Sequence, residues 1–181
     1  MRELSLHILD IVQNSLAAQA GTIKILVKEE REKDLLFIEI ADDGSGMSED
    51  QVKKALDPFY TTRTTRKVGL GLSLLQANCQ SCGGDVEIVS SPGQGTVVKA
   101  LFKHSHIDRP PLGDMVSTLV AMITGAPQVR FVYCHSVDGK EYCFDTAQVK
   151  EILEDVPINS PEVITWLKDY LREKERVLAS Q

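Results

Sequence analysis

The sequence has no long apolar run and no excess of basic residues. Its apolar stretches are too short to cross a bilayer, and its N-terminus lacks the basic-then-apolar pattern of a secretory signal. We therefore expect a cytoplasmic protein with no membrane partner. The 20 Lys and Arg residues are outnumbered by 26 Asp and Glu residues, and neither half of the chain is basic. Proteins that bind nucleic acid usually present a basic surface, so we also expect no nucleic-acid partner.

Cysteine is scarce, and its spacing fits no common metal site. Four cysteines in a chain without a secretory signal are more typical of thiols or metal ligands than of structural disulfides. Cys79 and Cys82 form a C-x2-C pair, whereas Cys134 and Cys143 face each other across a predicted hairpin. The four could bind zinc or an iron–sulfur cluster, or act as a redox switch. Because a second closely spaced pair is missing, we favour small apolar core residues and keep metal or redox chemistry as the alternative.

Hydrophobic periodicity predicts an α+β fold for the first hundred residues. The expected elements are a helix (4–19), two strands (22–28 and 35–42), a short helix capped by Ser48 (48–56), a second long helix (71–82) and two further strands (85–91 and 96–102). Consecutive antiparallel pairs with helices between them predict a mixed, mostly antiparallel sheet with helices on one face. This is a two-layer α/β sandwich.

The first helix has an apolar side and a polar side. On a helical wheel Ile8, Val12 and Leu16 share the apolar side. His7, Asp10 and Asn14 lie on the opposite side. We therefore expect the apolar side to face the sheet and these polar side chains to face away from the core.

The sequence changes character at residues 103–111, where two prolines and an absence of periodicity predict a linker. Beyond it we expect a helix (113–124), a hairpin that turns at Asp138-Gly139, and two more helices, the last of which begins at Pro161. We therefore divide the chain into a first domain (1–104) and a small C-terminal α+β unit (105–181). No motif in the second unit indicates its role.

Asp10 and Asn14 are the first of three polar clusters that can carry chemistry. They lie one helical turn apart and share a face. The amide oxygen of Asn14 suits Mg²⁺, which prefers oxygen ligands. The Asp10 carboxylate could orient or deprotonate a water or hydroxyl that attacks a phosphate. Taken alone, the pair is more typical of a solvated helix face.

The second cluster is the segment Asp42-Asp43-Gly44-Ser45-Gly46-Met47 at the end of an apolar strand. A half-buried carboxylate at this place can accept a hydrogen bond from an exocyclic amine such as that of adenine. The glycines allow the backbone to turn and to approach a ring closely. An ordinary strand-to-helix turn is the alternative interpretation.

The third cluster, Gly69-Leu70-Gly71-Leu72, opens a helix directly after a polar loop. Glycines at a helix N-terminus expose backbone N–H groups and the positive end of the helix dipole to a phosphate. Neither a Walker A loop nor a dinucleotide fingerprint is present. Lys67, with Arg63 and Arg66, could contact phosphate oxygens from the preceding loop.

Together these clusters resemble the motifs of the GHKL superfamily, the ATPases related to gyrase, Hsp90, histidine kinases and MutL. The resemblance covers roughly residues 4 to 103. HILDIVQNSLAA resembles the N box, ADDGSGM the G1 box, DPFYTT the F box, VGLGLSLLQ the G2 box and SPGQGT the last glycine motif. The PFYTT and GLGL details are similar to the histidine-kinase branch. The resemblance implies a Bergerat-type fold that binds ATP and Mg²⁺.

The resemblance also implies a role for individual residues. Asn14 would ligate Mg²⁺, and Asp42 would bind the adenine amine. Asp10 stands where ATP-hydrolysing members and anti-sigma-factor kinases carry a Glu base, and its shorter side chain leaves that assignment open. The remaining implied contacts are Gly44, Gly46, Met47 and Thr96 around the base, and Lys67, Gly69, Leu70, Gly71 and Leu72 at the phosphates, with residues 57–69 as the lid.

Few residues precede the N box, so we expect no phosphoacceptor helices upstream. His7 lacks the H-E-x-x-x-P surroundings of an autophosphorylated histidine. We therefore favour a stand-alone histidine-kinase-like or anti-sigma-factor-like kinase or ATPase, whose C-terminal unit recruits a protein partner or substrate. The alternatives are an ATP-gated switch without a phosphoryl acceptor and a redox- or metal-sensing accessory protein of a metalloenzyme system.

Overall fold

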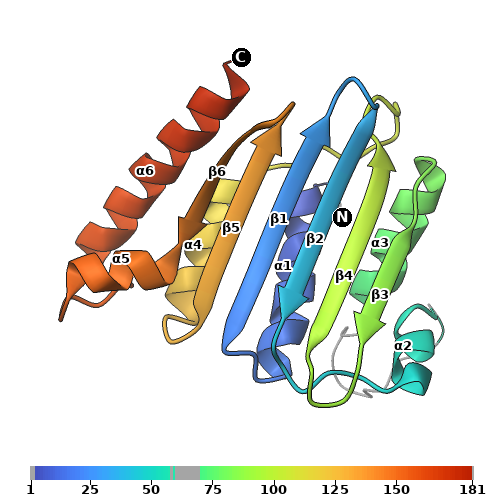
Figure 1. The fold of residues 1–181 in the computed structure, drawn as a ribbon, viewed down its shortest axis with the longest axis horizontal. Helices are drawn as coiled ribbons and strands as arrows, with labels where there is room; N and C mark the ends of the chain where they lie inside the picture. The colour runs from blue at the N-terminus through green and yellow to red at the C-terminus, as the bar shows by residue number, and fades with distance from the viewer. Residues whose placement is uncertain (1–2, 58, 60–69, 181) are drawn as a thin grey trace.

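The computed structural model describes residues 3–57, 59 and 70–180, and Figure 1 shows their arrangement. The helices are α1 (Leu4–Ala17), α2 (Glu49–Ala55), α3 (Leu70–Ser81), α4 (Met115–Gly125), α5 (Thr146–Leu153) and α6 (Pro161–Ala179). The strands are β1 (Thr22–Glu30), β2 (Leu35–Asp42), β3 (Val86–Ser90), β4 (Thr96–Lys103), β5 (Arg130–Val137) and β6 (Lys140–Asp145). Among the described residues, no helix is long and apolar enough to cross a membrane.

The strands form one six-stranded sheet in the order β3-β4-β2-β1-β5-β6. Every neighbouring pair is antiparallel except β1 and β5, which run parallel. Alternation sets which side is buried, since Leu36, Ile38 and Ile40 of β2 point into the core. The mixed, mostly antiparallel sheet confirms the predicted fold class.

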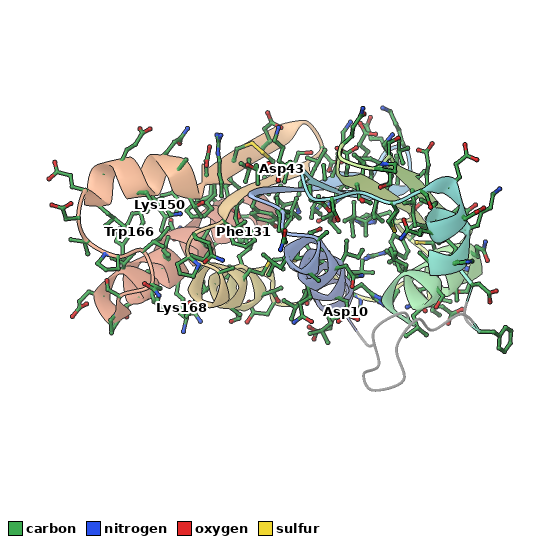
Figure 2. All side chains as sticks on the ribbon, turned by 90° about the horizontal axis from the view of Figure 1, so that it is seen from below. Asp10, Asp43, Phe131, Lys150, Trp166 and Lys168 are labelled. Carbon is green, nitrogen blue, oxygen red and sulfur yellow. A yellow bond between two sulfur atoms is a disulfide. The ribbon has the colours of Figure 1, made fainter. Side chains whose placement is uncertain are left out.

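Helices α1, α3, α4 and α6 cover one face of this sheet (Figure 2). Helix α1 lies in the middle and packs against both α3 and α4, while α6 packs against α4. The core between the layers is apolar and includes Ile8, Val12, Ile25 and Phe102, each at most 2% exposed. The two-layer arrangement follows from a sheet that buries one face under amphipathic helices.

The segment beyond residue 104 adds its two strands to the same sheet. Strand β5 pairs in parallel with β1, from Thr22 opposite Arg130 to Glu29 opposite Val137. The linker also contacts α1, because the backbone N–H groups of Leu4 and Ser5 donate to the carbonyls of Pro111 (2.9 Å) and Leu112 (2.8 Å). These bonds satisfy N–H groups that have no partner inside the first turn of a helix. The predicted boundary near residue 104 thus falls between β4 and α4.

Helix α1 has two buried sides rather than one. Ile8 and Val12 are buried as predicted, but His7 is only 1% exposed. Its Nε2 atom lies 2.9 Å from the Nδ2 atom of Asn78 in α3. The prediction that His7 faces away from the core is wrong, because α3 packs over that side of α1.

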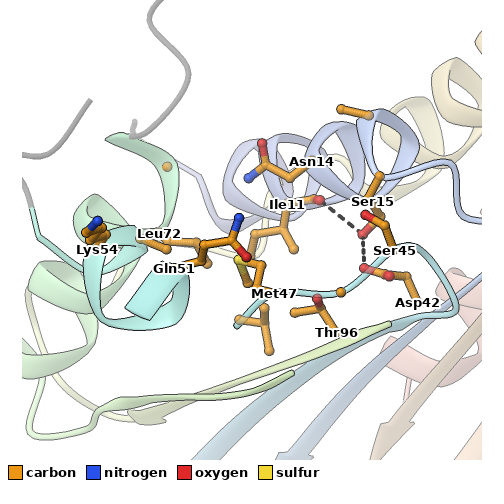
Figure 3. Close-up of a pocket in the computed structure, with 16 residues that line it drawn as sticks. Ile11, Asn14, Ser15, Asp42, Ser45, Met47, Gln51, Lys54, Leu72 and Thr96 are labelled. Atoms are coloured by element: carbon orange, nitrogen blue, oxygen red, sulfur yellow. Dashed lines mark hydrogen bonds between the residues drawn. The ribbon is translucent and has the colours of Figure 1, made fainter. Parts of the chain in front are cut away.

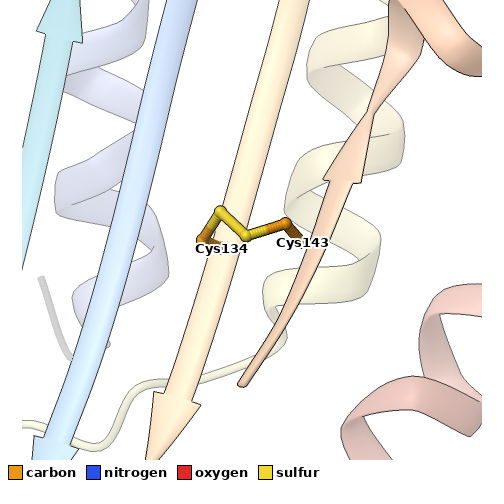
Figure 4. The surroundings of a disulfide bond; sticks show 2 residues. All are labelled: Cys134 and Cys143. Atoms are coloured by element: carbon orange, nitrogen blue, oxygen red, sulfur yellow. A yellow bond between two sulfur atoms is a disulfide. The ribbon is translucent and has the colours of Figure 1, made fainter.

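The four cysteines form one disulfide and two free thiols. Cys134 and Cys143 form a disulfide (Figure 4), so the expectation of thiols is wrong for this pair. The antiparallel register of β5 and β6 places the two residues directly opposite each other. Cys79 and Cys82 are fully buried free thiols, and burial raises the pKa of Cys79 to about 12. In the described part of the chain no group of three or more His, Cys, Asp or Glu residues is arranged to hold a metal.

A buried polar network joins β1 and β5 to α6. The His135 imidazole lies between two carboxylates, with Nε2 3.1 Å from Glu29 Oε1 and Nδ1 2.9 Å from Glu175 Oε2. Tyr133 and Tyr142 both donate to Glu175 Oε1. Burial alone would lower the pKa of His135, but its hydrogen bonds to Glu175 and Glu29 raise that pKa to about 9. The hydrogen bond from His135 in turn lowers the pKa of Glu29 to about 2.

We expect the network to make stability fall in alkali. A raised histidine pKa adds stability that is complete below about pH 6.5 and is lost as the pH rises through about 9. From pH 6.5 to 9.5 the free energy of unfolding should drop by on the order of 2 kcal/mol. In His135→Gln it should be lower at pH 6.5 and nearly flat over this range. Denaturant titrations at four pH values measure the free energy of unfolding. His106→Gln is the control, and its free energy of unfolding should depend on pH as that of the wild type does. If the free energy of unfolding depended on pH equally in His135→Gln and the wild type, His135 would not be the group responsible.

Candidate functional site

A cavity of about 590 Å³ opens between α1, the turn after β2, α2, the start of α3 and β4 (Figure 3). Its size lies within the usual range for small-molecule and cofactor sites. Seven predicted site residues line it: Asn14, Asp42, Gly46, Met47, Gly71, Leu72 and Thr96. Ser45, from the predicted segment 42–47, lines it too. The lining residues to which the sequence gave no individual role are Ile11, Ser15, Ala17, Ala18, Gln51, Lys54, Ala55 and Val98.

Helix α1 forms one wall of the cavity. Ile11, Asn14, Ser15 and Ala18 follow the spacing i, i+3, i+4 and i+7, which places them on one side of a helix. This spacing relative to Asn14 was the signal that could have identified the other three residues. The wall therefore combines two apolar side chains with one amide and one hydroxyl.

Asp42 stands at the end of β2 with both carboxylate oxygens already hydrogen-bonded. The Ser15 hydroxyl donates to Oδ2 at 2.6 Å, and the backbone N–H of Gly44 donates to Oδ1 at 2.9 Å. These two bonds, of which Figure 3 draws the one from Ser15, fix the orientation of a carboxylate that lines the cavity. Each oxygen has a second lone pair, so Asp42 can accept a further hydrogen bond from a ligand.

The neighbouring carboxylate, Asp43, has a different role. Its Oδ1 atom accepts hydrogen bonds from the backbone N–H groups of Thr22 (2.9 Å) and Gly21 (2.7 Å). These bonds, the one from Thr22 foremost, lower the pKa of Asp43. The side chain thus ties the turn after β2 to the start of β1, and it does not line the cavity.

Two turns that contain glycine, the one after β2 and the one between β3 and β4, approach each other closely beside Asp42. Gly46 has φ +68°, and a Cβ atom there would lie 2.0 Å from the carbonyl oxygen of Ser91. Gly95 has φ +80°, and a Cβ atom there would lie 1.9 Å from the carbonyl oxygen of Asp42. Only glycine fits this close approach of two backbones. The turns are also joined by the N–H of Gly93, which donates to the carbonyl of Ser45 at 2.7 Å.

Ser90 is a supporting residue that the sequence did not indicate. Its hydroxyl donates to the carbonyl of Gly95 and accepts the N–H of Met47, both at 2.8 Å. It also lies 2.8 Å from the Thr96 hydroxyl. Because Ser90 itself does not line the cavity, it acts by holding Met47 and Thr96, which do. Only its place just before the glycine turn could have drawn attention to it.

Helix α2 closes a further side of the cavity with Gln51, Lys54 and Ala55. Ser48 caps this helix through the predicted capping box, in which its hydroxyl accepts the N–H of Gln51 and the Gln51 side chain accepts the N–H of Ser48. The cap fixes where α2 begins. Lys54 brings a cationic side chain to the cavity wall (Figure 3).

The start of α3 meets α1 beside the cavity. Asp10 Oδ2 lies 3.2 Å from the position that a Cβ atom on Gly71 would take, so a larger residue there would crowd the Asp10 side chain. Burial raises the pKa of Asp10. Asp10 itself does not line the cavity, and neither does Gly44, which packs against the carbonyl of Ala18.

Lys67 and Gly69 lie outside the described residues, as does most of the predicted lid, with Arg63 and Arg66. Leu70 is the first residue of α3. The phosphate contacts predicted for this segment therefore stay predictions.

Comparison with known families settles what kind of domain this is. The family model described as histidine kinase-, DNA gyrase B-, and HSP90-like ATPase matches residues 2–106, which is more than half of the 181 residues. The chain belongs to this family. Membership implies an ATP-binding domain, and the matched segment contains α1, the turn after β2, α2, the start of α3 and β4, which together form the cavity.

Two similar curated proteins are bacterial kinases. The chain is 32% identical over 96 residues to sensor histidine kinase WalK of Bacillus subtilis, covering 49% of this chain and 16% of that kinase. It is 33% identical over 91 residues to sporulation kinase E of the same organism, covering 49% of this chain and 12% of the kinase. The chain thus matches less than a fifth of each of these proteins. The family's ATPase domain is shared, whereas the activities of the whole kinases are not thereby assigned.

Solved structures share the fold over a longer stretch of the chain. The MutL ATPase domain of Aquifex aeolicus, solved in complex with ADP, superposes with a TM-score of 0.53 at 16% identity. The superposition covers 85% of this chain and 70% of that chain. The N-terminal domain of a DNA repair protein gives a TM-score of 0.52 at 18% identity, covering 79% of this chain and 52% of the other. These likenesses confirm the Bergerat-type fold.

The close approach of Gly95 to the backbone of Asp42 can be tested with Gly93 as a matched control. Gly93 and Gly95 both have φ near +80°, but an added Cβ atom at Gly93 meets nothing within 4 Å. Gly93→Ala should therefore lower the free energy of unfolding by only about 1 kcal/mol of conformational strain and leave the affinity for ADP near that of the wild type. Gly95→Ala must displace the carbonyl of Asp42 and should weaken nucleotide binding at least about tenfold, or about 1.4 kcal/mol. Calorimetric titration with ADP measures both, and equal effects of the two substitutions would contradict the close approach.

Proposed function

We propose that this chain binds ATP·Mg²⁺ in the cavity and passes the γ-phosphate to water or to a protein hydroxyl, as a stand-alone histidine-kinase-like or anti-sigma-factor-like enzyme. The observation that carries the proposal is the orientation of Asp42. Its carboxylate is held by Ser15 and Gly44 and lines the cavity, where it can accept a hydrogen bond from the adenine amine. Gly46, Met47 and Thr96 line the cavity near it, with apolar contacts from Ile11 and Val98.

The opposite part of the cavity suits phosphates. Gly71 and Leu72 bring the N-terminal turn of α3 to the wall, and a helix N-terminus offers backbone N–H groups and a positive dipole end. Lys54 adds a positive charge from α2. In this account Lys67, Gly69 and Leu70 complete the phosphate contacts, and residues 57–69 act as the lid.

Asn14 fits a Mg²⁺ ligand by its chemistry and its place. It is exposed on the cavity wall, one turn after Asp10 on α1. Amide oxygens suit Mg²⁺, and the bound ion would neutralise negative charge that develops on the phosphates. Asn14 would orient the ion through its side-chain oxygen.

Asp10 is the candidate base. It lies beside Gly71, where the α1 wall meets the phosphate-facing turn, and its raised pKa makes it a better proton acceptor than an exposed aspartate. Because it does not line the cavity directly, we propose that it acts on a water or hydroxyl held above Gly71.

Three substitutions separate these roles. Asp42→Asn should weaken ATP and ADP binding alike by about tenfold or more, because the adenine amine loses a charged acceptor. Asn14→Ala should weaken ATP·Mg²⁺ binding more than metal-free ADP binding. Asp10→Asn should leave binding unchanged and lower turnover about 100-fold or more. Calorimetry and phosphate release from [γ-³²P]ATP measure these effects.

The controls are neighbours of the tested residues. Asp43→Asn changes the adjacent carboxylate, which does not line the cavity, and Gln13→Ala changes an exposed residue next to Asn14. Both should bind and turn over ATP as the wild type does. Equal losses in Asp42→Asn and Asp43→Asn would contradict the adenine assignment. Binding without turnover in the wild type would favour an ATP-gated switch, and transfer of label to an added protein would favour a kinase.

We assign recruitment of a protein partner to residues 105–181. In this segment α6 exposes part of an aromatic pair, since Trp166 is 49% exposed and stacks on Tyr170 with ring centroids 5.2 Å apart. Half-exposed aromatic side chains are common at protein interfaces. The network around His135 joins α6 to β5 and to β1, which belongs to the nucleotide domain.

A redox-sensing role is the second candidate, and the disulfide favours it. Cys143 is exposed, so an external thiolate can reach the bond, whereas Cys79 and Cys82 are buried. Attack by a dithiol reagent would convert the bond to two protein thiols while the reagent becomes a disulfide. The hairpin would keep its β5–β6 ladder and the Glu175 hydrogen bonds after reduction.

Native thiol titration tests this role. After reduction with dithiothreitol in the absence of denaturant, and removal of the reagent, we expect two reactive protein thiols per chain, from Cys134 and Cys143. The far-UV circular dichroism spectrum should be unchanged. Cys79 and Cys82 should react only after unfolding, because burial keeps the Cys79 thiol protonated. A Cys134→Ser variant should show the single thiol of Cys143 without reductant. A bond that resists reduction until the protein unfolds would make it a structural disulfide.

A further inference from the structure

We propose that His7 and Asn78 form a positioning pair that sets the phosphate-facing start of α3 against α1. The inference rests on the proposed nucleotide site and deepens it. His7 is in the second turn of α1, and its Nε2 atom accepts a hydrogen bond from the Asn78 side chain of α3 at 2.9 Å. Neither residue lines the cavity.

The two helices run in opposite directions along their contact. His7 meets Asn78, while three residues later on α1 Asp10 meets Gly71, seven residues earlier on α3. Residues i and i+7 share one side of a helix, so Asn78 and Gly71 lie two turns apart on the side of α3 that faces α1. A shift of α3 at Asn78 is therefore carried along the helix to Gly71 at the cavity wall.

Stability alone does not explain a polar pair at this place. His7 is 1% exposed, and burial lowers its pKa to about 4, so its imidazole is neutral in ordinary buffers. A neutral imidazole has one donor and one acceptor nitrogen. With Nε2 accepting from Asn78, Nδ1 carries the proton, and this buried atom has no hydrogen-bond partner in the described part of the chain. An unpaired buried donor costs free energy that a leucine would not.

The hydrogen bond between His7 and Asn78 instead fixes the position of α3 along α1. An apolar contact slides with little change in energy, whereas a hydrogen bond has a preferred distance and direction. At Gly71 the two helices are close enough that a Cβ atom would lie 3.2 Å from Asp10 Oδ2, so the two contacts mark both ends of the shared interface. The adenine end of the cavity is held separately, by Asp42, Ser15 and the glycine turns.

Loss of the pair should therefore act on the γ-phosphate end and spare the adenine end. We expect His7→Leu and Asn78→Leu each to lower turnover about tenfold, and the affinity for a non-hydrolysable ATP analogue about fivefold, with ADP affinity within about twofold of the wild type. The double variant should be no worse than either single variant, because both remove one interaction. His7→Gln, whose amide oxygen can accept from Asn78, should restore most of the loss.

The ratio of the affinities for the ATP analogue and for ADP distinguishes the two possibilities. If the pair only stabilised the fold, its loss would leave this ratio unchanged. Gln13→Leu, a leucine at an exposed position of α1, is the matched control and should bind both nucleotides normally. If a leucine variant does not fold, Asn78→Ala removes the donor without added volume and carries the same expectation. Leucine variants that bind analogue and ADP like the wild type, and are more stable, would overturn the inference. A wild-type chain that binds no nucleotide would overturn the proposed function, and the inference with it.

Discussion

The packing of α1 on the middle of the sheet is the constraint on which the rest of the structure depends. One side of this helix fills the core with Ile8 and Val12, and another contacts α3 through His7 and Asp10. Its third side, around Asn14 and Ser15, is the wall of the cavity. Because a helix is rigid over four turns, fixing α1 against the sheet and the linker also fixes the site residues that it carries.

The second constraint is the close approach of two backbones under Asp42. The turn after β2 and the turn between β3 and β4 can only meet where Gly46 and Gly95 lack side chains. Ser90 and Gly93 then bond the turns to each other. The turns position the backbone of Asp42, and its carboxylate is then held by the N–H of Gly44 and the hydroxyl of Ser15 before any ligand is present. Such preorganisation reduces the entropy lost on binding.

Local patterns in the sequence were sufficient for the elements of the first hundred residues, because period, caps and glycine turns act over a few residues. The capping box at Ser48 is an example. The same holds for the hairpin turn at Asp138-Gly139 in the later part of the chain. The motif resemblance also placed Asn14, Asp42 and Gly71 around one cavity.

Features that depend on distant partners were not predictable in this way. The wheel of α1 could not show that α3 would cover His7. The residue pattern alone does not distinguish the adjacent carboxylates Asp42 and Asp43, and only the motif resemblance selected Asp42. The parallel pairing of β5 with β1 joins segments about a hundred residues apart. The Cys134–Cys143 bond needed the strand register as well as the hairpin.

A crystal structure of the chain with a non-hydrolysable ATP analogue and Mg²⁺ tests the central claim most directly. The account predicts adenine in the cavity with its exocyclic amine within hydrogen-bond distance of Asp42, and the metal within coordination distance of Asn14. It also predicts that the analogue's phosphates lie against the first turn of α3. An analogue bound elsewhere, or with its adenine away from Asp42, would contradict the account.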